Sequence, residues 1–178
     1  FGRYDWYRLG AGELVGKQNA DGHWGRDPSD TAFALLFLAK GNRPVLFQKV
    51  QWNGRWNRNI HDLEHLCAFI GDKLGKPTTW QSTALDIPLE ELRTSPVLLV
   101  TGHRFPAFSE KETVKLRSFI REAGGTLLFE ACCGSKEFAD GFRAYVKKLA
   151  PEHTLRPLEA DHPVFHTYYD LQETCGLQ

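Results

Sequence analysis

The chain has 178 residues, 42% of them hydrophobic and 25% charged, an ordinary composition for a globular protein. Lysine plus arginine and aspartate plus glutamate each number 22, so the formal net charge is zero and nucleic acid is disfavoured as a partner. The longest apolar run, residues 32–39, is too short to form a membrane span.

The chain contains no methionine and begins with Phe1, so we expect it to be a segment of a longer protein. Its compartment, cytoplasmic or periplasmic, stays open, because four cysteines form neither a disulfide framework nor a Cys-x-x-Cys zinc pair. No cofactor is expected.

Residues 1–41 have a helical pattern and are expected to form a hairpin. Asp5 is placed to cap a first helix that continues to Gln18. A second helix follows over residues 31–40, with a proline at its start and Gly41 as its stop. This second helix is apolar nearly all round, which predicts burial on most of its sides.

A motif in this hairpin consists of Leu14, Gln18, Gly22 and Trp24, followed by the apolar residues 31–38. It resembles the glutamine–tryptophan repeat of the squalene cyclase and prenyltransferase α/α toroids. The resemblance implies a partial, last repeat whose partners are further toroid repeats of the same parent protein, since each unit buries its face against neighbours. The acidic motifs of cyclase and prenyltransferase chemistry are absent from this segment, so that activity is not implied.

Residues 42–58 are expected to connect the hairpin to a second domain at residues 59–178. Within this connector, we expect an edge strand at Val45 to Val50, because a proline precedes this segment and its apolar residues alternate only partly. Trp52 and Trp56 are expected in an aromatic loop, where they either stack on a ligand or pack against the hairpin.

The second domain is expected to begin with a helix from about Ile60 to Leu74. Asn59 is its expected cap and Gly75 its expected stop, and its apolar residues recur at helical spacing. A strand over residues 78–83 and a short helix over residues 86–93 are expected to follow.

A strand–helix–strand unit comes next, and its signals are the strongest in the chain. Residues 96–100 are a continuous apolar run, typical of a strand in a parallel sheet. Ser109 and Glu112 form a capping box at the start of a helix that Gly124 and Gly125 end. A second apolar strand at residues 126–131 completes a βαβ unit.

Two further elements are predicted beyond this unit. Residues 136–149 form an amphipathic helix that Pro151 stops. His153 to Leu158 predicts the next strand, and a turn at residues 161–163 leads into an aromatic cluster.

Five segments of the second part carry a family resemblance: Trp56–Arg58, Pro96–His103, Gly124–Phe129, Cys133–Gly134 and Asp161–Phe165. With them, residues 52–178 resemble an uncharacterised bacterial domain family of the class I glutamine amidotransferase-like superfamily. The resemblance implies an α/β fold with a three-layer, flavodoxin-like parallel sheet, and further strands after Gln178. The family has no established activity.

Two cysteines lie where a class I amidotransferase presents its nucleophile. Cys132 and Cys133 follow the strand at 126–131, and at such a turn the amides of the next helix lower the pKa of a thiol and bind an oxyanion. His162 is the candidate base, although Val164 stands where amidotransferases carry glutamate. The alternative is that both cysteines are small residues packed at the sheet edge.

A ligand pocket is a second candidate at the same edge, where open α/β sheets bind their ligands. His103 and Arg104 follow the first strand of the βαβ unit, and they are expected to line the pocket with residues around the end of the second strand: Glu130, Cys133 and Ser135. The alternative is a simple turn at His103.

His61 and His65 lie four residues apart on a helix, a spacing that can bind a metal. Exposed polar histidines explain them equally well, and no metal site is assigned.

Two functions remain open for the chain. The first is a non-catalytic module of a larger bacterial protein that binds a small ligand or a protein, and the incomplete triad favours it. The second is a cysteine-dependent hydrolase or amidotransferase that uses Cys132 or Cys133. In isolation, the apolar helix and an unpaired strand edge predict self-association.

Overall fold

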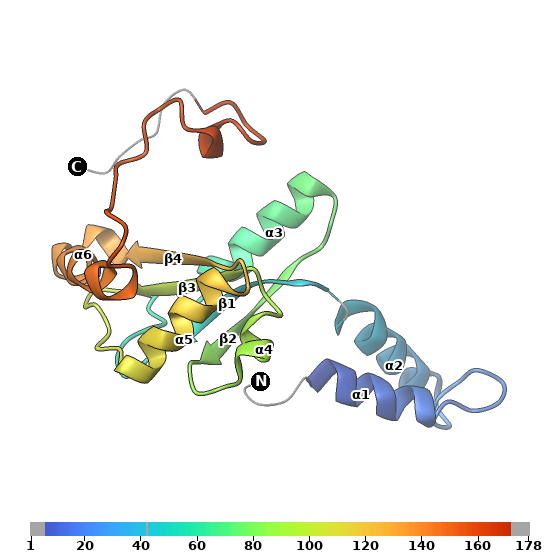
Figure 1. The fold of residues 1–178 in the computed structure, drawn as a ribbon. Helices are drawn as coiled ribbons and strands as arrows, with labels where there is room; N and C mark the ends of the chain where they lie inside the picture. Colours follow the sequence, from blue (N-terminus) through green and yellow to red (C-terminus); the bar gives the residue numbers. More distant parts are fainter. Residues whose placement is uncertain (1–5, 42, 172–178) are drawn as a thin grey trace.

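The computed structural model describes residues 6–41 and 43–171. Its centre is a four-stranded, all-parallel sheet with the order β2-β1-β3-β4 (Figure 1). The strands are β1 (Val45–Gln51), β2 (Thr79–Ala84), β3 (Val97–Gly102) and β4 (Thr126–Ala131). The α/β class and the parallel sheet are thereby confirmed.

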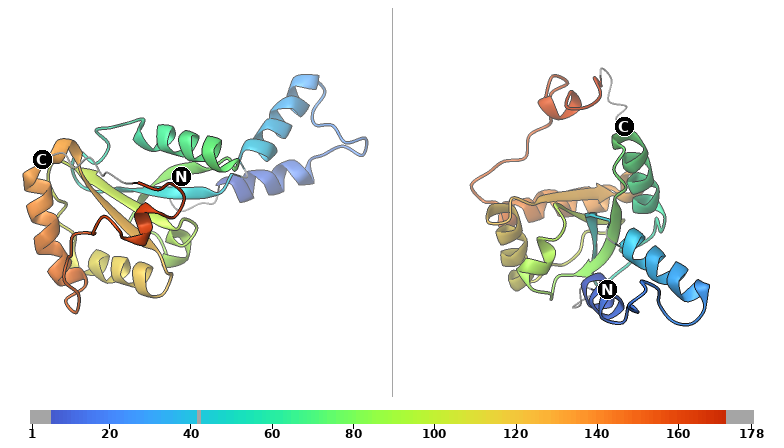
Figure 2. Two further views of the ribbon diagram at one scale, coloured as in Figure 1. Left: turned by 90° about the horizontal axis from the view of Figure 1, so that it is seen from above. Right: turned by 90° about the vertical axis from the view of Figure 1, so that its right-hand side faces the viewer.

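Helices cover both faces of this sheet and make three layers (Figure 2). On one face, α3 (Asp62–Leu74) packs its Leu63 and Cys67 on Phe47 and Leu99. On the other face, α4 (Leu89–Leu92), α5 (Glu110–Arg121) and α6 (Lys136–Leu149) enclose a larger core around Leu98 and Val100. Successive residues of β3 thus serve opposite cores, as the two-residue period of a strand requires.

The βαβ unit forms as its sequence predicts. Ser109 and Glu112 cap α5 reciprocally, and β3 pairs with β4 in parallel from Val97 opposite Thr126 to Gly102 opposite Ala131. The glycine pair has two separate roles. Gly124 adopts a left-handed φ of 65°, and Gly125 lies so close to the Phe119 ring that a Cβ there would overlap it.

The expectation for β1 is wrong in one respect. β1 pairs with both β2 and β3, so it is a central strand and not an edge strand, although it lies within the expected connector. The preceding proline does not interrupt the ladder because it stands before the strand, where its carbonyl accepts a hydrogen bond from Thr79 N (3.0 Å). Residues 47–50 are all buried, as a central position requires.

The start of α3 also differs from its prediction. The residue before the helix is His61, which makes no side-chain cap. Asn59 instead accepts a hydrogen bond from Lys49 at its carbonyl and donates one to Cys132 from its side chain. The predicted stop is confirmed, since Gly75 has a left-handed φ of 64°.

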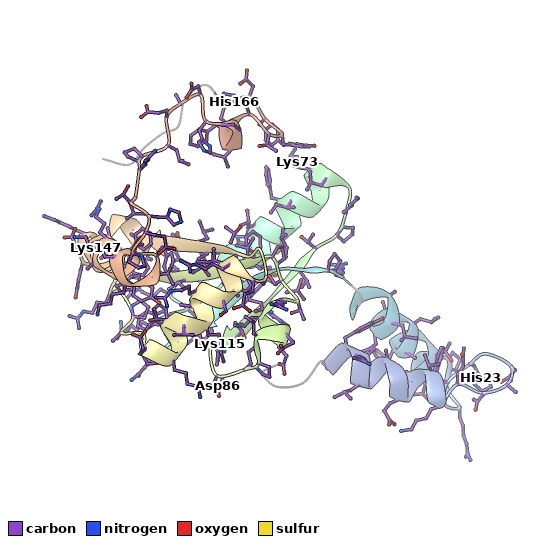
Figure 3. All side chains as sticks on the ribbon, in the orientation of Figure 1. His23, Lys73, Asp86, Lys115, Lys147 and His166 are labelled. Atoms are coloured by element: carbon purple, nitrogen blue, oxygen red, sulfur yellow. The ribbon has the colours of Figure 1, made fainter. Side chains whose placement is uncertain are left out.

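On the opposite face of the sheet, Lys115 of α5 donates to the carbonyls of Leu85 and Ile87, beside the turn that carries Asp86 (Figure 3).

The strand expected at His153–Leu158 does not form. Residues 150–171 run as a mostly exposed chain with one short 3-10 turn, η2 (Pro163–Phe165). Leu155 and Leu158 stay about half exposed because no described strand lies alongside to pair with this segment. Tyr168 Oη donates to Lys73 O (2.9 Å), so the segment returns to the end of α3.

The predicted hairpin is present as α1 (Trp6–Gly16) and α2 (Pro28–Gly41), while the Asp5 cap lies outside the described residues. Trp24 is buried and its Nε1 donates to Leu14 O (2.6 Å), and Gln18 Nε2 donates to Gly22 O (2.8 Å). Both motif side chains therefore act inside the hairpin.

The expected burial of the second helix is not found. Phe33, Leu35 and Leu36 of α2 are exposed, because α1 covers one side only and the hairpin projects from the sheet (Figure 1). Among the described helices, none combines the length and the apolar character that a membrane crossing requires.

Candidate functional site

Loops from three strands meet at the carboxyl edge of the sheet. β1, β3 and β4 run parallel, so the segments that follow Gln51, Gly102 and Ala131 all leave the sheet on one side. Most of the predicted site residues lie in or beside these loops.

The two cysteines occupy the turn between β4 and α6. Cys132 is 2% exposed, whereas Cys133 is exposed and has a φ of 56°. It is the single non-glycine residue with positive φ in the described chain, and Gly134 follows at 69°. Ser135 then caps α6 by accepting a hydrogen bond from Phe138 N (3.3 Å). The expected strand–turn–helix geometry is confirmed, and it is strained at Cys133.

His103 approaches both thiols from the loop after β3. Its ring, Cys132 and Cys133 each place a nitrogen or sulfur atom within 4.8 Å of the others, and the two sulfur atoms lie 3.6 Å apart. Ser135 Oγ donates to His103 O (2.5 Å) and so ties this loop to the start of α6. Three candidates from two separate predicted sites thus belong to one cluster.

Burial, more than any charge, raises the pKa of the Cys132 thiol. The neighbouring Cys133 and the Glu130 carboxylate raise this pKa further, while a hydrogen bond from Asn59 Nδ2 to Cys132 Sγ (3.6 Å) acts in the opposite direction. The thiolate form of Cys132 is therefore disfavoured near neutral pH, which makes this thiol a poor nucleophile.

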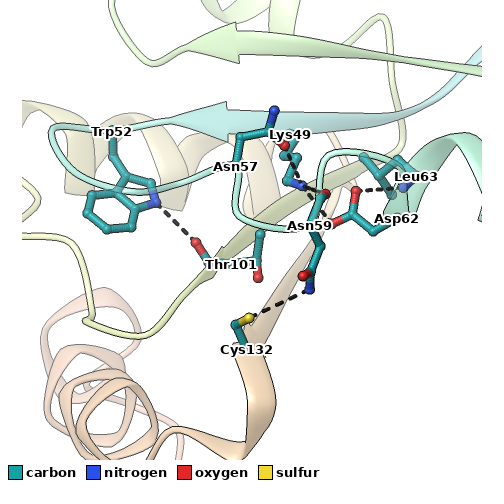
Figure 4. A network of polar contacts seen from close by, with 8 residues as sticks. All are labelled: Lys49, Trp52, Asn57, Asn59, Asp62, Leu63, Thr101 and Cys132. Carbon is teal, nitrogen blue, oxygen red and sulfur yellow. Dashed lines mark hydrogen bonds and ion pairs between the residues drawn. The ribbon is translucent and has the colours of Figure 1, made fainter.

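A buried lysine holds the loop that carries Asn59 (Figure 4). Lys49 of β1 is 0% exposed, and its Nζ donates to Asp62 Oδ2 (2.6 Å), Asn57 Oδ1 (2.9 Å) and Asn59 O (2.9 Å). All three ammonium protons are thereby satisfied. This network fixes the end of the loop after β1 and extends through Asn59 to Cys132. The sequence signal for this network is a single lysine, Lys49, inside a largely apolar strand.

A tryptophan anchors the beginning of the same loop. Trp52 Nε1 donates to Thr101 O of β3 (3.3 Å), and the indole lies against Gly102, where a Cβ would come within 2.8 Å of it. The loop is therefore fixed to the sheet at both ends, at Trp52 and at Asn57.

Residues 54–58, between these two anchors, line a shallow depression of 440 Å³. Arg55 and Arg58 are exposed there, and neither forms an ion pair with a described carboxylate. Trp56 is half-buried beside them. The depression thus offers two exposed cations and an aromatic ring.

The remaining candidates form no described hydrogen bond with either thiol, although the Glu130 charge acts on Cys132. Arg104 Nε pairs with Glu137 Oε1 (3.2 Å) in solvent, and Glu130 is exposed on β4. His162 sits in the turn at η2, where its Nδ1 accepts from Val164 N (3.2 Å), and no described contact joins it to either cysteine.

The histidine pair on α3 is stacked and partly engaged. The rings of His61 and His65 are 5.9 Å apart, and His61 Nδ1 lies 2.7 Å from Glu64 Oε2.

These features define an all-parallel α/β domain with a polar cluster at the carboxyl edge of its sheet. The chain belongs to the family described as a domain of unknown function (DUF4159), whose model matches residues 46–177. None of the curated proteins matches the chain.

Proposed function

We propose that the chain is a non-catalytic module that binds a small anionic ligand with residues 54–58. The observation that carries the proposal is the loop after β1, which Trp52 and the Lys49 network fix to the sheet, while Arg55 and Arg58 form no ion pair with a carboxylate of the described residues. A loop held in place before binding loses little entropy on binding, so its contacts contribute more to affinity.

The chemistry of the depression favours an anion. Guanidinium groups bind carboxylates and phosphates through planar, paired hydrogen bonds, and a half-buried indole supplies a face for the apolar part of a ligand. Because both arginines are exposed, salt is expected to weaken the interaction.

Titration of the whole chain with inorganic phosphate and with pyrophosphate tests the proposal, with tryptophan fluorescence and calorimetry as readouts. Arg55→Ala with Arg58→Ala is expected to abolish binding. A charge-matched control, Arg26→Ala with Arg156→Ala, removes two exposed arginines outside this loop and is expected to leave binding unchanged. Equal loss in both double variants, or no binding by the parent chain, would contradict the proposal.

A cysteine-dependent hydrolase is the second candidate function, and one observation favours it. Cys133 is exposed, strained and placed before α6, with His103 close by. If the chain is a binding module, we expect Cys133 to react with iodoacetamide like any exposed thiol and the buried Cys132 to react slowly. Rapid labelling of Cys133 near neutral pH that slows in His103→Ala would favour the hydrolase.

The superfamily of the sheet domain and the partners of the helical hairpin are proposed from the sequence resemblances. We propose that the sheet domain is of the class I amidotransferase-like type and that α1 and α2 pack on toroid repeats of a parent protein. The parallel sheet with a cysteine at a strand-to-helix turn supports the first, and the exposed apolar residues of α2 support the second.

A further inference from the structure

We propose that His103, Cys132 and Cys133 form a zinc-binding site with one coordination position left open. This site uses residues and a ligand different from those of the anion-binding loop, so neither proposal depends on the other.

The spacing of the donor atoms fits zinc. Tetrahedral Zn²⁺ with Zn–S distances near 2.3 Å places two sulfur ligands about 3.8 Å apart. The two sulfur atoms lie 3.6 Å apart in the structure, with a His103 nitrogen within 4.8 Å of both. Two thiols and one imidazole are also a donor set that zinc accepts in three-ligand sites.

The backbone arranges these donors before any ion arrives. The left-handed conformation of Cys133 turns its sulfur back toward that of Cys132, and the φ of 69° at Gly134 completes the turn. The hydrogen bond from Ser135 to His103 O holds the third donor against the same turn. A strained residue at a cluster of ligating atoms is what a preformed site is expected to show.

Binding balances its charges and protons. Each thiol releases one proton to solvent on coordination, the imidazole binds in its neutral form, and the two thiolates neutralise the dication. A neutral centre suits the buried position of Cys132. Asn59 Nδ2 already donates toward Cys132 Sγ (3.6 Å), as outer partners of zinc thiolates do.

The stacked histidine pair on α3 serves as a comparison for the proposed site. His61 and His65 stack at 5.9 Å but bring no cysteine, and Glu64 already engages His61. They are therefore the matched control for binding by imidazole alone.

The test loads the metal-stripped 178-residue chain with Zn²⁺ and measures affinity against a chromophoric chelator. Co²⁺ then replaces zinc and reports thiolate ligands by its charge-transfer absorption. The expected result is one ion per chain with a thiolate band. Cys133 is exposed, so the fold is expected to tolerate Cys133→Ser. Removal of an outer partner typically weakens metal binding roughly 10–100-fold, and loss of this direct ligand should weaken zinc binding by more than that. His103→Ala should do the same.

Asn59→Ala separates positioning from ligation. It should weaken zinc binding about 10–100-fold and shift the cobalt–thiolate band to lower energy, because a thiolate without its hydrogen bond is a better electron donor. The control, His61→Ala with His65→Ala, should retain both affinity and band. Full zinc affinity in a folded Cys133→Ser chain, a cobalt spectrum without a thiolate band, or loss of binding in the control would overturn the proposal.

Discussion

Phe33 of α2 and Phe119 of α5 are the same residue type in helices of similar length, yet Phe33 is 71% exposed and Phe119 is 0% exposed. The difference lies in what each helix faces. α5 packs on the sheet between α4 and α6, whereas α2 packs mainly on α1. Apolar content alone therefore does not predict burial, because a helix also needs a surface wide enough to cover its apolar face.

The largest expected difference comes from truncating these two phenylalanines. Phe119→Ala opens a cavity in the main core and is expected to lower the free energy of unfolding by about 3–5 kcal/mol. Phe33→Ala is expected to change it by less than about 0.5 kcal/mol. Urea denaturation followed by circular dichroism measures both, and similar losses would show that α2 is packed as tightly as α5.

The Lys49 network gives the next largest effect within the sheet region. Asp62→Ala leaves the fully buried ammonium of Lys49 without its carboxylate partner. It is expected to lower the free energy of unfolding by about 3–5 kcal/mol. Lys49→Met is expected to cost less, because water reaches the Asp62 side chain, which keeps 21% exposure. The reverse order in urea denaturation would mean that Asp62 is not the main partner of Lys49.

Tyr145 provides a smaller, pH-dependent effect. Burial raises the pKa of this phenol above its ordinary value of 10.0, so its contribution to stability is full below about pH 10. As pH rises further, the unfolded state ionises first, and this contribution is lost up to the raised pKa of the folded state.

At neutral pH, Tyr145→Phe should lower the free energy of unfolding by about 0.5–1.5 kcal/mol, because it removes only the hydrogen bond to Thr113. Above about pH 10, the stability of this variant should fall less steeply with pH than that of the parent, because the variant has no phenol to ionise at this position. The exposed Tyr169→Phe is the control and should follow the parent at every pH. Parallel curves for Tyr145→Phe and the parent would contradict burial of this phenol.

Removing residues 1–41 should have the smallest effect on stability. The sheet keeps its core, so the free energy of unfolding is expected to stay within about 0.5 kcal/mol, while self-association decreases because the exposed apolar residues of α2 are gone. Light scattering and urea denaturation measure the two quantities. A shortened chain that no longer folds would show that the hairpin supports the sheet.

Local signals in the sequence predicted most of the sheet region. The capping box at Ser109, the glycine pair at 124–125 and the helical period of residues 136–149 each fix an element through its own neighbours. The central position of β1 was not predicted, because which strands lie side by side depends on contacts far apart in the sequence.

The candidate site was predicted only in part for the same reason. His103 and Cys133 were expected near one another since both follow parallel strands, and the structure brings them together. Lys49 and Asn59 were missed because their partners come from different segments, and a lone lysine in a strand does not name the side chains it will meet.

The most direct test of the account is nuclear magnetic resonance of the arginine side-chain Nε–Hε groups during titration of the whole chain with inorganic phosphate. Anion binding by residues 54–58 predicts chemical-shift changes at Arg55 and Arg58 that saturate, and none at Arg26 or Arg156. Uniform small shifts at all exposed arginines, or none at residues 55 and 58, would contradict an anion-binding loop at the carboxyl edge of the sheet.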